Sequence, residues 1–158
     1  MIFVTVGGQM PFDRLIRTID EWAQATGRTD CFAQIGPSKF SPEHISYTNF
    51  LEPQEFRQCM AEASGVVAHA GMGTILMALE IGLPILVLPR LARLRETRND
   101  HQTATARHLA DAGLVLAARD EMELPMRLAE LETSRMRTPI TRTANADLLG
   151  VLRRYALD

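Results

Sequence analysis

The chain has 158 residues, which is enough for one domain with an apolar core but little more. Hydrophobic residues make up 46% of it and charged residues 23%, values that are typical of a folded globular protein. The net charge of -2 gives no general electrostatic reason to bind nucleic acid, and no run approaches the roughly 18 apolar positions of a membrane-spanning helix. Cys31 and Cys59 have no metal-ligand spacing around them, so we expect no metal site.

Runs of β-branched and apolar residues alternate with segments of helical spacing along most of the chain. We expect short, mostly buried strands at residues 1–6, 30–35, 45–51, 65–70, 84–89 and 114–118. We expect helices where apolar residues recur every three or four positions, at residues 12–26, 53–63, 71–82 and 99–112. This alternation predicts an α/β fold, a Rossmann-like doubly wound parallel sheet with helices on both faces.

The last stretch of the chain, from Thr133, differs in character from the rest. It carries several arginines and then an amphipathic segment with apolar residues on one side, namely Leu148, Val151, Leu152 and Tyr155. We therefore divide the chain into a Rossmann-like domain, residues 1–132, and a C-terminal helical appendage, residues 133–158. We expect a partner to bind the appendage, although its apolar face could instead pack on the domain.

Two glycine-containing loops, Gly7–Met10 and His69–Thr74, follow the first and fourth strands. In an open parallel sheet, ligands bind beyond the carboxyl ends of the strands, at the point where the strand order reverses. We expect both loops to lie there. The helix that begins after Gly71 would direct free N–H groups and its positive dipole end into the gap, where a diphosphate is the natural occupant. A tight turn that needs glycine for geometry alone is the alternative interpretation.

The second loop does not match two common nucleotide-binding motifs. Position 76 is leucine, so the dinucleotide pattern G-x-G-x-x-G is absent, and no Gly-Lys-Ser/Thr follows as in a P-loop. Nicotinamide cofactors and ATP are therefore disfavoured. His69 ends its strand beside this turn, where it is either a hydrogen-bonded core residue or part of the site.

A polar cluster, Asn99-Asp100-His101-Gln102, follows the arginine-rich loop at residues 90–98. Asn99 could cap the helix that begins here, and its neighbours could be solvated residues of the first turn. The cluster nevertheless follows a long loop at the ligand-binding edge, and its amide and carboxylate groups suit sugar hydroxyls. The residues therefore indicate contact with a sugar.

These motifs occur together in one family. The start of the chain, Met1–Gly7 followed by Pro11–Ile16, resembles the PssE-type exopolysaccharide glycosyltransferase subunits. The resemblance continues in the same order through His69–Thr74, Ala78–Glu80, Gly82–Pro84, Pro89 and Asn99–Gln102. It covers about residues 1–132. It extends to the cytosolic subunit of the eukaryotic dolichol-linked GlcNAc transferase and to the C-terminal, donor-binding half of the bacterial lipid II GlcNAc transferase.

The resemblance implies half of a GT-B glycosyltransferase, which binds a UDP-sugar as its substrate and uses no cofactor. The donor and its diphosphate would be bound by Gly8, Gln9, His69, Gly71, Met72, Gly73 and Thr74. The uracil edge would be read by the backbone around Phe50 and Leu51. The donor sugar would be contacted by Asn99, Asp100, His101 and Gln102. The helix N-terminus would stabilise the UDP leaving group as negative charge develops on it.

The resemblance also implies a partner. The acceptor would bind a separate, membrane-associated PssD-like subunit, which would also supply the general base, so we assign no catalytic residue here. We expect a cytoplasmic subunit, peripheral to the inner membrane through its partner, that takes part in inverting hexosyl transfer to a lipid-linked acceptor in polysaccharide biosynthesis. An isolated chain could form a homodimer through the same apolar surface.

Two other functions fit the motifs less well. A non-catalytic nucleotide-sugar-binding or partner-stabilising module is slightly favoured by Met77, because relatives often carry a ribose-binding glutamate there. The intact Asn99–Gln102 cluster disfavours it. A UDP-sugar 2-epimerase of related fold is disfavoured, since that chemistry needs both halves of the fold in one chain.

Overall fold

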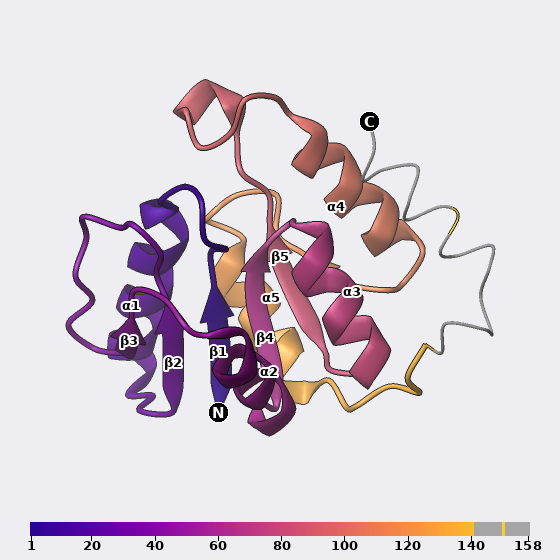
Figure 1. The fold of residues 1–158 in the computed structure, drawn as a ribbon, viewed down its shortest axis with the longest axis horizontal. Coiled ribbons are helices and arrows are strands. Elements are labelled where there is room, and N and C mark those ends of the chain that lie inside the picture. Colours follow the sequence, from indigo (N-terminus) through magenta and orange to yellow (C-terminus); the bar gives the residue numbers. More distant parts are fainter. Residues whose placement is uncertain (141–149, 151–158) are drawn as a thin grey trace.

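The structure is a computed structural model that describes residues 1–140 and Gly150. Within them, a parallel six-stranded sheet has the order β3-β2-β1-β4-β5-β6 (Figure 1). The strands are β1 (Ile2–Thr5), β2 (Cys31–Gln34), β3 (Ser46–Thr48), β4 (Gly65–His69), β5 (Ile85–Leu88) and β6 (Leu116–Ala117). The helices are α1 (Asp13–Thr26), α2 (Pro53–Glu62), α3 (Met72–Ile81), the 3-10 helix η1 (Ala92–Leu94), α4 (His101–Asp111) and α5 (Leu124–Thr133). The predicted α/β fold, a doubly wound Rossmann-like sheet, is confirmed.

Helices cover both faces of the sheet. On one face, Val4 of β1 belongs to the same buried cluster as Leu15 of α1 and Leu128 of α5. On the other face, the neighbouring Phe3 belongs to a cluster with Ile75 of α3 and Leu109 of α4, together with residues of α2. Successive strand residues point to opposite faces, so a strand that is apolar throughout can serve both cores.

Helix α1 shows how the sequence pattern produces one of these layers. Its buried residues recur at helical spacing, at Leu15, Ile16, Ile19, Asp20, Trp22 and Ala23. The helix ends at Gly27, which adopts the left-handed conformation with φ 68° and donates its N–H to the Gln24 carbonyl. A residue with a side chain is strained in this conformation, so glycine stops the helix where the pattern predicted.

Three elements differ from their expected bounds by two residues or more at one end. The strand expected at 45–51 is Ser46–Thr48, the strand expected at 114–118 is Leu116–Ala117, and the helix expected at 99–112 begins only at His101, with Asp100 as its N-cap. The pattern did not predict α5, which begins with a proline in its first turn and buries Leu124, Leu128 and Leu131 against β5 and β6. No helix among the described residues is long and apolar enough to cross a bilayer.

Helix α5 runs through the expected domain boundary at residue 132. Beyond it, the N–H of Arg137 donates to the Gly82 carbonyl at 2.8 Å, and that of Ile140 to the Leu79 carbonyl at 3.1 Å. The first part of the expected appendage therefore lies along the end of α3. Its amphipathic helix, with Leu148, Val151, Leu152 and Tyr155, lies outside the described residues, and the division into two parts stays a prediction.

Candidate functional site

The strand order reverses between β1 and β4, which are parallel neighbours with Thr5 paired to Ala68. The chain leaves β1 toward β2 on one side, whereas β4 is followed by β5 on the other. The loops that follow β1 and β4 therefore separate at this edge and leave room for a ligand. Both predicted glycine loops lie there.

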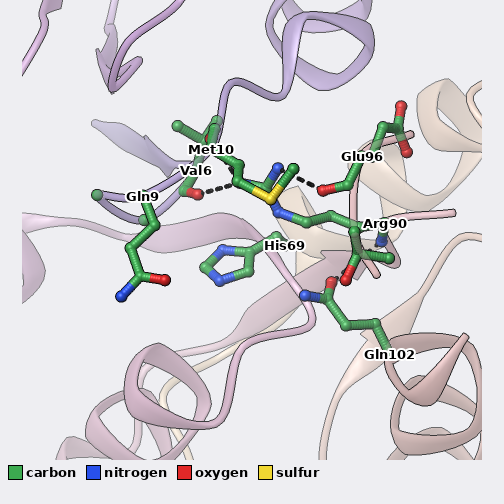
Figure 2. A pocket seen from close by; sticks show the side chains of 10 residues that line it. Val6, Gln9, Met10, His69, Arg90, Glu96 and Gln102 are labelled. Atoms are coloured by element: carbon green, nitrogen blue, oxygen red, sulfur yellow. Dashed lines mark hydrogen bonds between the residues drawn. The ribbon is translucent and has the colours of Figure 1, made fainter. Parts of the chain in front are cut away.

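Two cavities flank the loop after β1, and both include Gly7 and Gly8 in their walls. The first, here called the His69 cavity, has a volume of about 340 Å³ and is lined by Val6, Gly7, Gly8, Gln9, Met10, His69, Arg90, Glu96, Thr97 and Gln102 (Figure 2). The second, here called the Thr74 cavity, has a volume of about 350 Å³ and is lined by Thr5, Gly7, Gly8, Gln34, Leu51, Pro53, Phe56, Arg57, Gly73, Thr74 and Met77.

Helix α3 directs its N-terminus at this edge of the sheet. Gly71 is its N-cap, and Gly73 and Thr74 in its first turn line the Thr74 cavity. The first N–H groups of a helix have no partner within the helix, and they carry its positive dipole end. A Cβ atom on Gly73 would meet nothing within 4 Å, so the backbone is open to a ligand at this point. The arrangement suits a phosphate or diphosphate.

The imidazole of His69 lies between the two glycine loops. A Cβ atom on Gly71 would overlap with its Nε2, and one on Gly7 would lie 3.0 Å from its Cε1. Gly71 is thus needed for the space that His69 occupies. Burial and the nearby Arg90 cation lower the pKa of His69 to about 4, so the ring is neutral at neutral pH. Its Nδ1 is buried without a hydrogen-bond partner among the described residues.

Gln102 joins the ends of two strands and presents its amide nitrogen to the His69 cavity. Its Oε1 accepts hydrogen bonds from the backbone N–H of Ala70 at 3.2 Å and of Arg90 at 3.0 Å. Both acceptor positions of that oxygen are therefore used, and the NH₂ group is the part that can contact a ligand. In Figure 2 the Gln102 side chain approaches His69 from the α4 side. A donor at this position suits a sugar hydroxyl.

Arg90 holds the loop after β1 in place. It is only 5% exposed, and its guanidinium donates to the carbonyl oxygens of Val6, Met10, Pro11 and Glu96. Figure 2 shows Arg90 among Val6, Met10 and Glu96. It also lies over the Phe12 ring, 4.7 Å from the centroid. Because these carbonyls are directed toward Arg90, the loop keeps one shape beside the cavity. The sequence interpretation gave Arg90 no role of its own within the arginine-rich loop at residues 90–98, although an arginine directly after a buried strand end was a usable signal.

A second arginine fixes the loop that follows β5. Arg14 of α1 binds Glu96 through two hydrogen bonds, at 2.8 and 2.9 Å, and reaches the Pro89 carbonyl and the Glu121 carboxylate. The Glu96 carboxylate also accepts the Leu91 N–H at 2.9 Å. Glu96 is the carboxylate that lines the His69 cavity, and these bonds occupy both of its oxygens.

Residues 1–150 match the family model of the glycosyltransferase family 28 C-terminal domain. The chain belongs to this family. Over 122 residues it is 29% identical to human UDP-N-acetylglucosamine transferase subunit ALG13, an alignment that covers 71% of this chain and 10% of the human protein. The chain thus spans about a tenth of the length of that relative.

Solved structures place this family 28 domain among GT-B glycosyltransferases. A solution structure of ALG13 matches with a TM-score of 0.66 and 18% identity, covering 99% of this chain and 96% of that one. The crystal structure of the glycotransferase of kitacinnamycin matches with a TM-score of 0.62 and 25% identity, covering 98% of this chain and 38% of that one. The fold is that of the C-terminal domain of GT-B enzymes.

The family 28 domain brings together part of the predicted site. Among the predicted donor residues, Gly8, Gln9 and His69 line one cavity, and Gly73 and Thr74 line the other. Met72 packs partly on the core below α3. For the uracil, Leu51 lines the Thr74 cavity, whereas Phe50 is 56% exposed and is not among the lining residues.

The predicted sugar-binding cluster is divided. Gln102 lines the His69 cavity, but Asn99, Asp100 and His101 are exposed and line neither cavity. The Asn99 side chain accepts the N–H of His101 at 3.1 Å, and the Asp100 side chain accepts that of Ala92 at 3.1 Å. These two residues therefore shape the loop before α4. Among the described residues, no group of three or more His, Cys, Asp or Glu is placed to hold a metal ion.

Proposed function

We propose that this family 28 domain is the donor-binding subunit of a two-component glycosyltransferase. It takes a UDP-sugar and transfers the hexosyl group, with inversion, to a lipid-linked acceptor in polysaccharide biosynthesis. The observation that carries the proposal is the pair of cavities that meet at Gly7–Gly8, with the N-terminus of α3 beside them. One cavity is suited to a nucleotide and the other to its sugar.

We assign a part of the donor to each cavity. The diphosphate lies at the first turn of α3, against Gly73 and Thr74, with the nucleoside in the Thr74 cavity. The sugar then passes the Gly7–Gly8 loop into the His69 cavity, where the Gln102 amide donates to a hydroxyl. When the acceptor hydroxyl attacks the anomeric carbon, the bond to the UDP oxygen breaks, and the helix N-terminus stabilises the charge that develops on UDP.

The general base comes from a second subunit. The His69 ring, with a pKa of about 4, is a weak base. The Glu96 carboxylate is engaged by Arg14 and by the Leu91 N–H. Neither group is suited to accept the proton of the acceptor hydroxyl. A membrane-associated, PssD-like acceptor subunit would supply the base and hold this cytoplasmic chain at the inner membrane. The relative ALG13 is itself described as a subunit of a transferase.

Calorimetric titration with UDP tests the donor site, with ADP and NAD as control ligands. Gly73→Asp places a carboxylate at the diphosphate position, and Gly73→Asn is the matched neutral control, because a side chain here meets open space. At about 8 Å and an effective dielectric of about 20, the repulsion between unit charges is about 2 kcal/mol, or roughly 30-fold in affinity. Preference for ADP or NAD, or equal UDP affinity of the two variants, would contradict the proposed donor site.

Among the described residues, the two bases that line the His69 cavity are unsuited to accept the acceptor proton, which also fits a second function, a nucleotide-sugar-binding module that stabilises a partner without catalysis. Both functions predict UDP binding, so binding alone does not separate them. The two functions are separated by measuring turnover of a UDP-sugar by the chain together with its acceptor subunit. Release of UDP only when both chains are present supports the transferase, and its absence with a folded complex supports the module.

A further inference from the structure

The segment between β5 and α4 concentrates positive charge. Residues 90–98 hold four arginines and one carboxylate, in a chain whose net charge is -2. Three of these arginines are exposed, namely Arg93, Arg95 and Arg98. None of the three forms an ion pair with a carboxylate among the described residues. The one carboxylate of the segment, Glu96, is instead bound by Arg14. The charge of the exposed arginines is therefore not neutralised by the part of the protein that the structure describes.

An apolar side chain lies in the middle of this charge. Leu94, the last residue of η1, is 44% exposed and has an exposed arginine on each side of it in the sequence. Met10, from the loop after β1, is 37% exposed. Its carbonyl and that of Glu96 bind the same guanidinium, that of Arg90, so the two loops lie side by side. Single exposed apolar residues are ordinary, but here they occur within an unpaired basic segment.

The apex of the segment has a fixed shape. The N–H of Leu94 donates to the Leu91 carbonyl at 3.2 Å, and that of Arg95 to the Ala92 carbonyl at 2.9 Å. The Asp100 carboxylate accepts the N–H of Ala92 at 3.1 Å. Arg95 has a φ of 57°, a left-handed conformation that glycine adopts with less strain. The turn thus presents an arginine at a position where the backbone geometry favours glycine.

The segment borders the cavity in which the proposed function places the sugar. Glu96 and Thr97 line the His69 cavity. In Figure 1 the segment lies at the top of the view, beyond the carboxyl ends of the strands. A lipid-linked acceptor has its lipid in a bilayer, so its hydroxyl reaches this cavity only when the rim of the cavity approaches the bilayer surface. Side chains of this rim are then close to lipid headgroups.

We propose that Arg93, Leu94 and Arg95, here called the η1 surface, bind the surface of a bilayer that contains anionic phospholipids. This inference rests on the proposed function, and it adds a direct contact with lipid to the anchoring by a partner subunit. The guanidinium groups donate to lipid phosphates, while their apolar stems lie beside Leu94 as it enters the headgroup region. A stable protein interface buries about 800 Å² on each side, far more than one projecting turn presents.

Sedimentation of the full chain with lipid vesicles tests the inference. One set of vesicles is phosphatidylcholine alone, and the other is phosphatidylcholine mixed with phosphatidylglycerol. Each basic residue near an anionic surface contributes about fivefold in affinity, so two arginines predict roughly 30-fold tighter binding to the anionic vesicles at low salt. Arg95→Gln should lose about fivefold on these vesicles, and Leu94→Ser a similar factor. Both variants should keep the UDP affinity of the wild type, because neither residue lines a cavity.

A second variant guards against a fault in folding. Arg95→Gly removes the same charge and fits the left-handed backbone without strain. It should lose the same fivefold on anionic vesicles and remain at least as stable as the wild type in urea. If Arg95→Gly binds these vesicles as the wild type does, the inference is wrong.

The chain also offers a matched control. Arg135 and Met136 are an exposed arginine and an exposed apolar residue beyond α5. They lie at the opposite edge of the sheet, since the N–H of the next residue, Arg137, donates to the Gly82 carbonyl just before β5. Arg135→Gln and Met136→Ser should leave vesicle binding unchanged. An equal loss in these variants would show that binding follows overall charge, and would overturn the inference.

The remaining outcomes separate this inference from the proposed function. Absence of vesicle binding, or equal binding to neutral and anionic vesicles, would overturn the η1 surface while UDP binding remained. If the variants instead lose binding to the acceptor subunit with vesicle binding unchanged, the surface is a protein interface and the inference is also overturned. Failure of UDP to bind, with discrimination between the vesicles intact, would contradict the proposed function alone.

Discussion

Arg90 offers the sharpest test of how this site is held together. In Arg90→Met the side chain keeps most of its apolar stem but loses its guanidinium, which bonds the carbonyls of Val6, Met10, Pro11 and Glu96. Three of these bonds connect β5 to the segment after β1, about 80 positions earlier in the chain. The substitution therefore removes the main polar link between the two sides of the His69 cavity.

The size of the stability loss in Arg90→Met depends on the surroundings of each carbonyl that loses its donor. The bond to Val6 is buried, so its loss leaves an acceptor without water and costs about 1–3 kcal/mol. The other three bonds are partly buried, and water from the cavity can replace the donor at a cost of about 0.5–1 kcal/mol each. The free energy of unfolding should therefore fall by about 2.5–6 kcal/mol. Arg90→Lys, with a compact ammonium, should lose about half of that.

Urea unfolding followed by circular dichroism measures the loss, and titration with UDP measures its effect on the site. Arg98→Met is the matched control, because Arg98 is exposed in the same loop, and it should change stability by less than about 0.5 kcal/mol. Below its unfolding range, Arg90→Met should bind UDP about tenfold more weakly, since the Gly7–Gly8 loop is no longer held. A loss of stability below about 1 kcal/mol with unchanged UDP affinity would refute this account of Arg90.

Two further substitutions test other parts of the structure. Gly71→Ala should displace the His69 ring, because the added Cβ would overlap with Nε2. Urea unfolding should show a loss of stability of about 1–3 kcal/mol for this variant. Gly73→Ala, where the added Cβ lies in open space, is the control and should change stability very little. Asp20 accepts the N–H groups of Glu43, His44 and Ile45. Burial raises its pKa, but the bonds from His44 and Glu43 outweigh this and hold it below its usual value. The ionised Asp20 carboxylate thus stabilises the fold above pH about 4, and this stabilisation is lost on further acidification. The free energy of unfolding of Asp20→Asn should therefore fall less with acid than that of the wild type. Parallel pH profiles would contradict that role.

The sequence predicted the sheet and four of its helices because their signals are local. A run such as residues 1–6 is apolar at every position except Thr5, and α1 repeats its apolar residues every three or four positions until Gly27. The prediction did not include helix α5, although it carries a similar repeat at Leu124, Leu128 and Leu131 and, like α2, has a proline in its first turn. The loops after β1 and β4 were found because glycines directly after buried strands mark the binding edge of such folds.

The sequence by itself thus determined the fold, its family and the edge at which a ligand binds, since these depend on periodicity and on motifs of a few adjacent residues. Only the tertiary structure decided which polar side chains form the site. Gln102 faces the cavity while its neighbour His101 is exposed, because α4 turns by about 100° per residue. Arg90 owes its role to carbonyl groups about 80 positions earlier in the chain. Contacts between residues so far apart in the sequence form only when the sheet assembles, so no local sequence pattern predicts them.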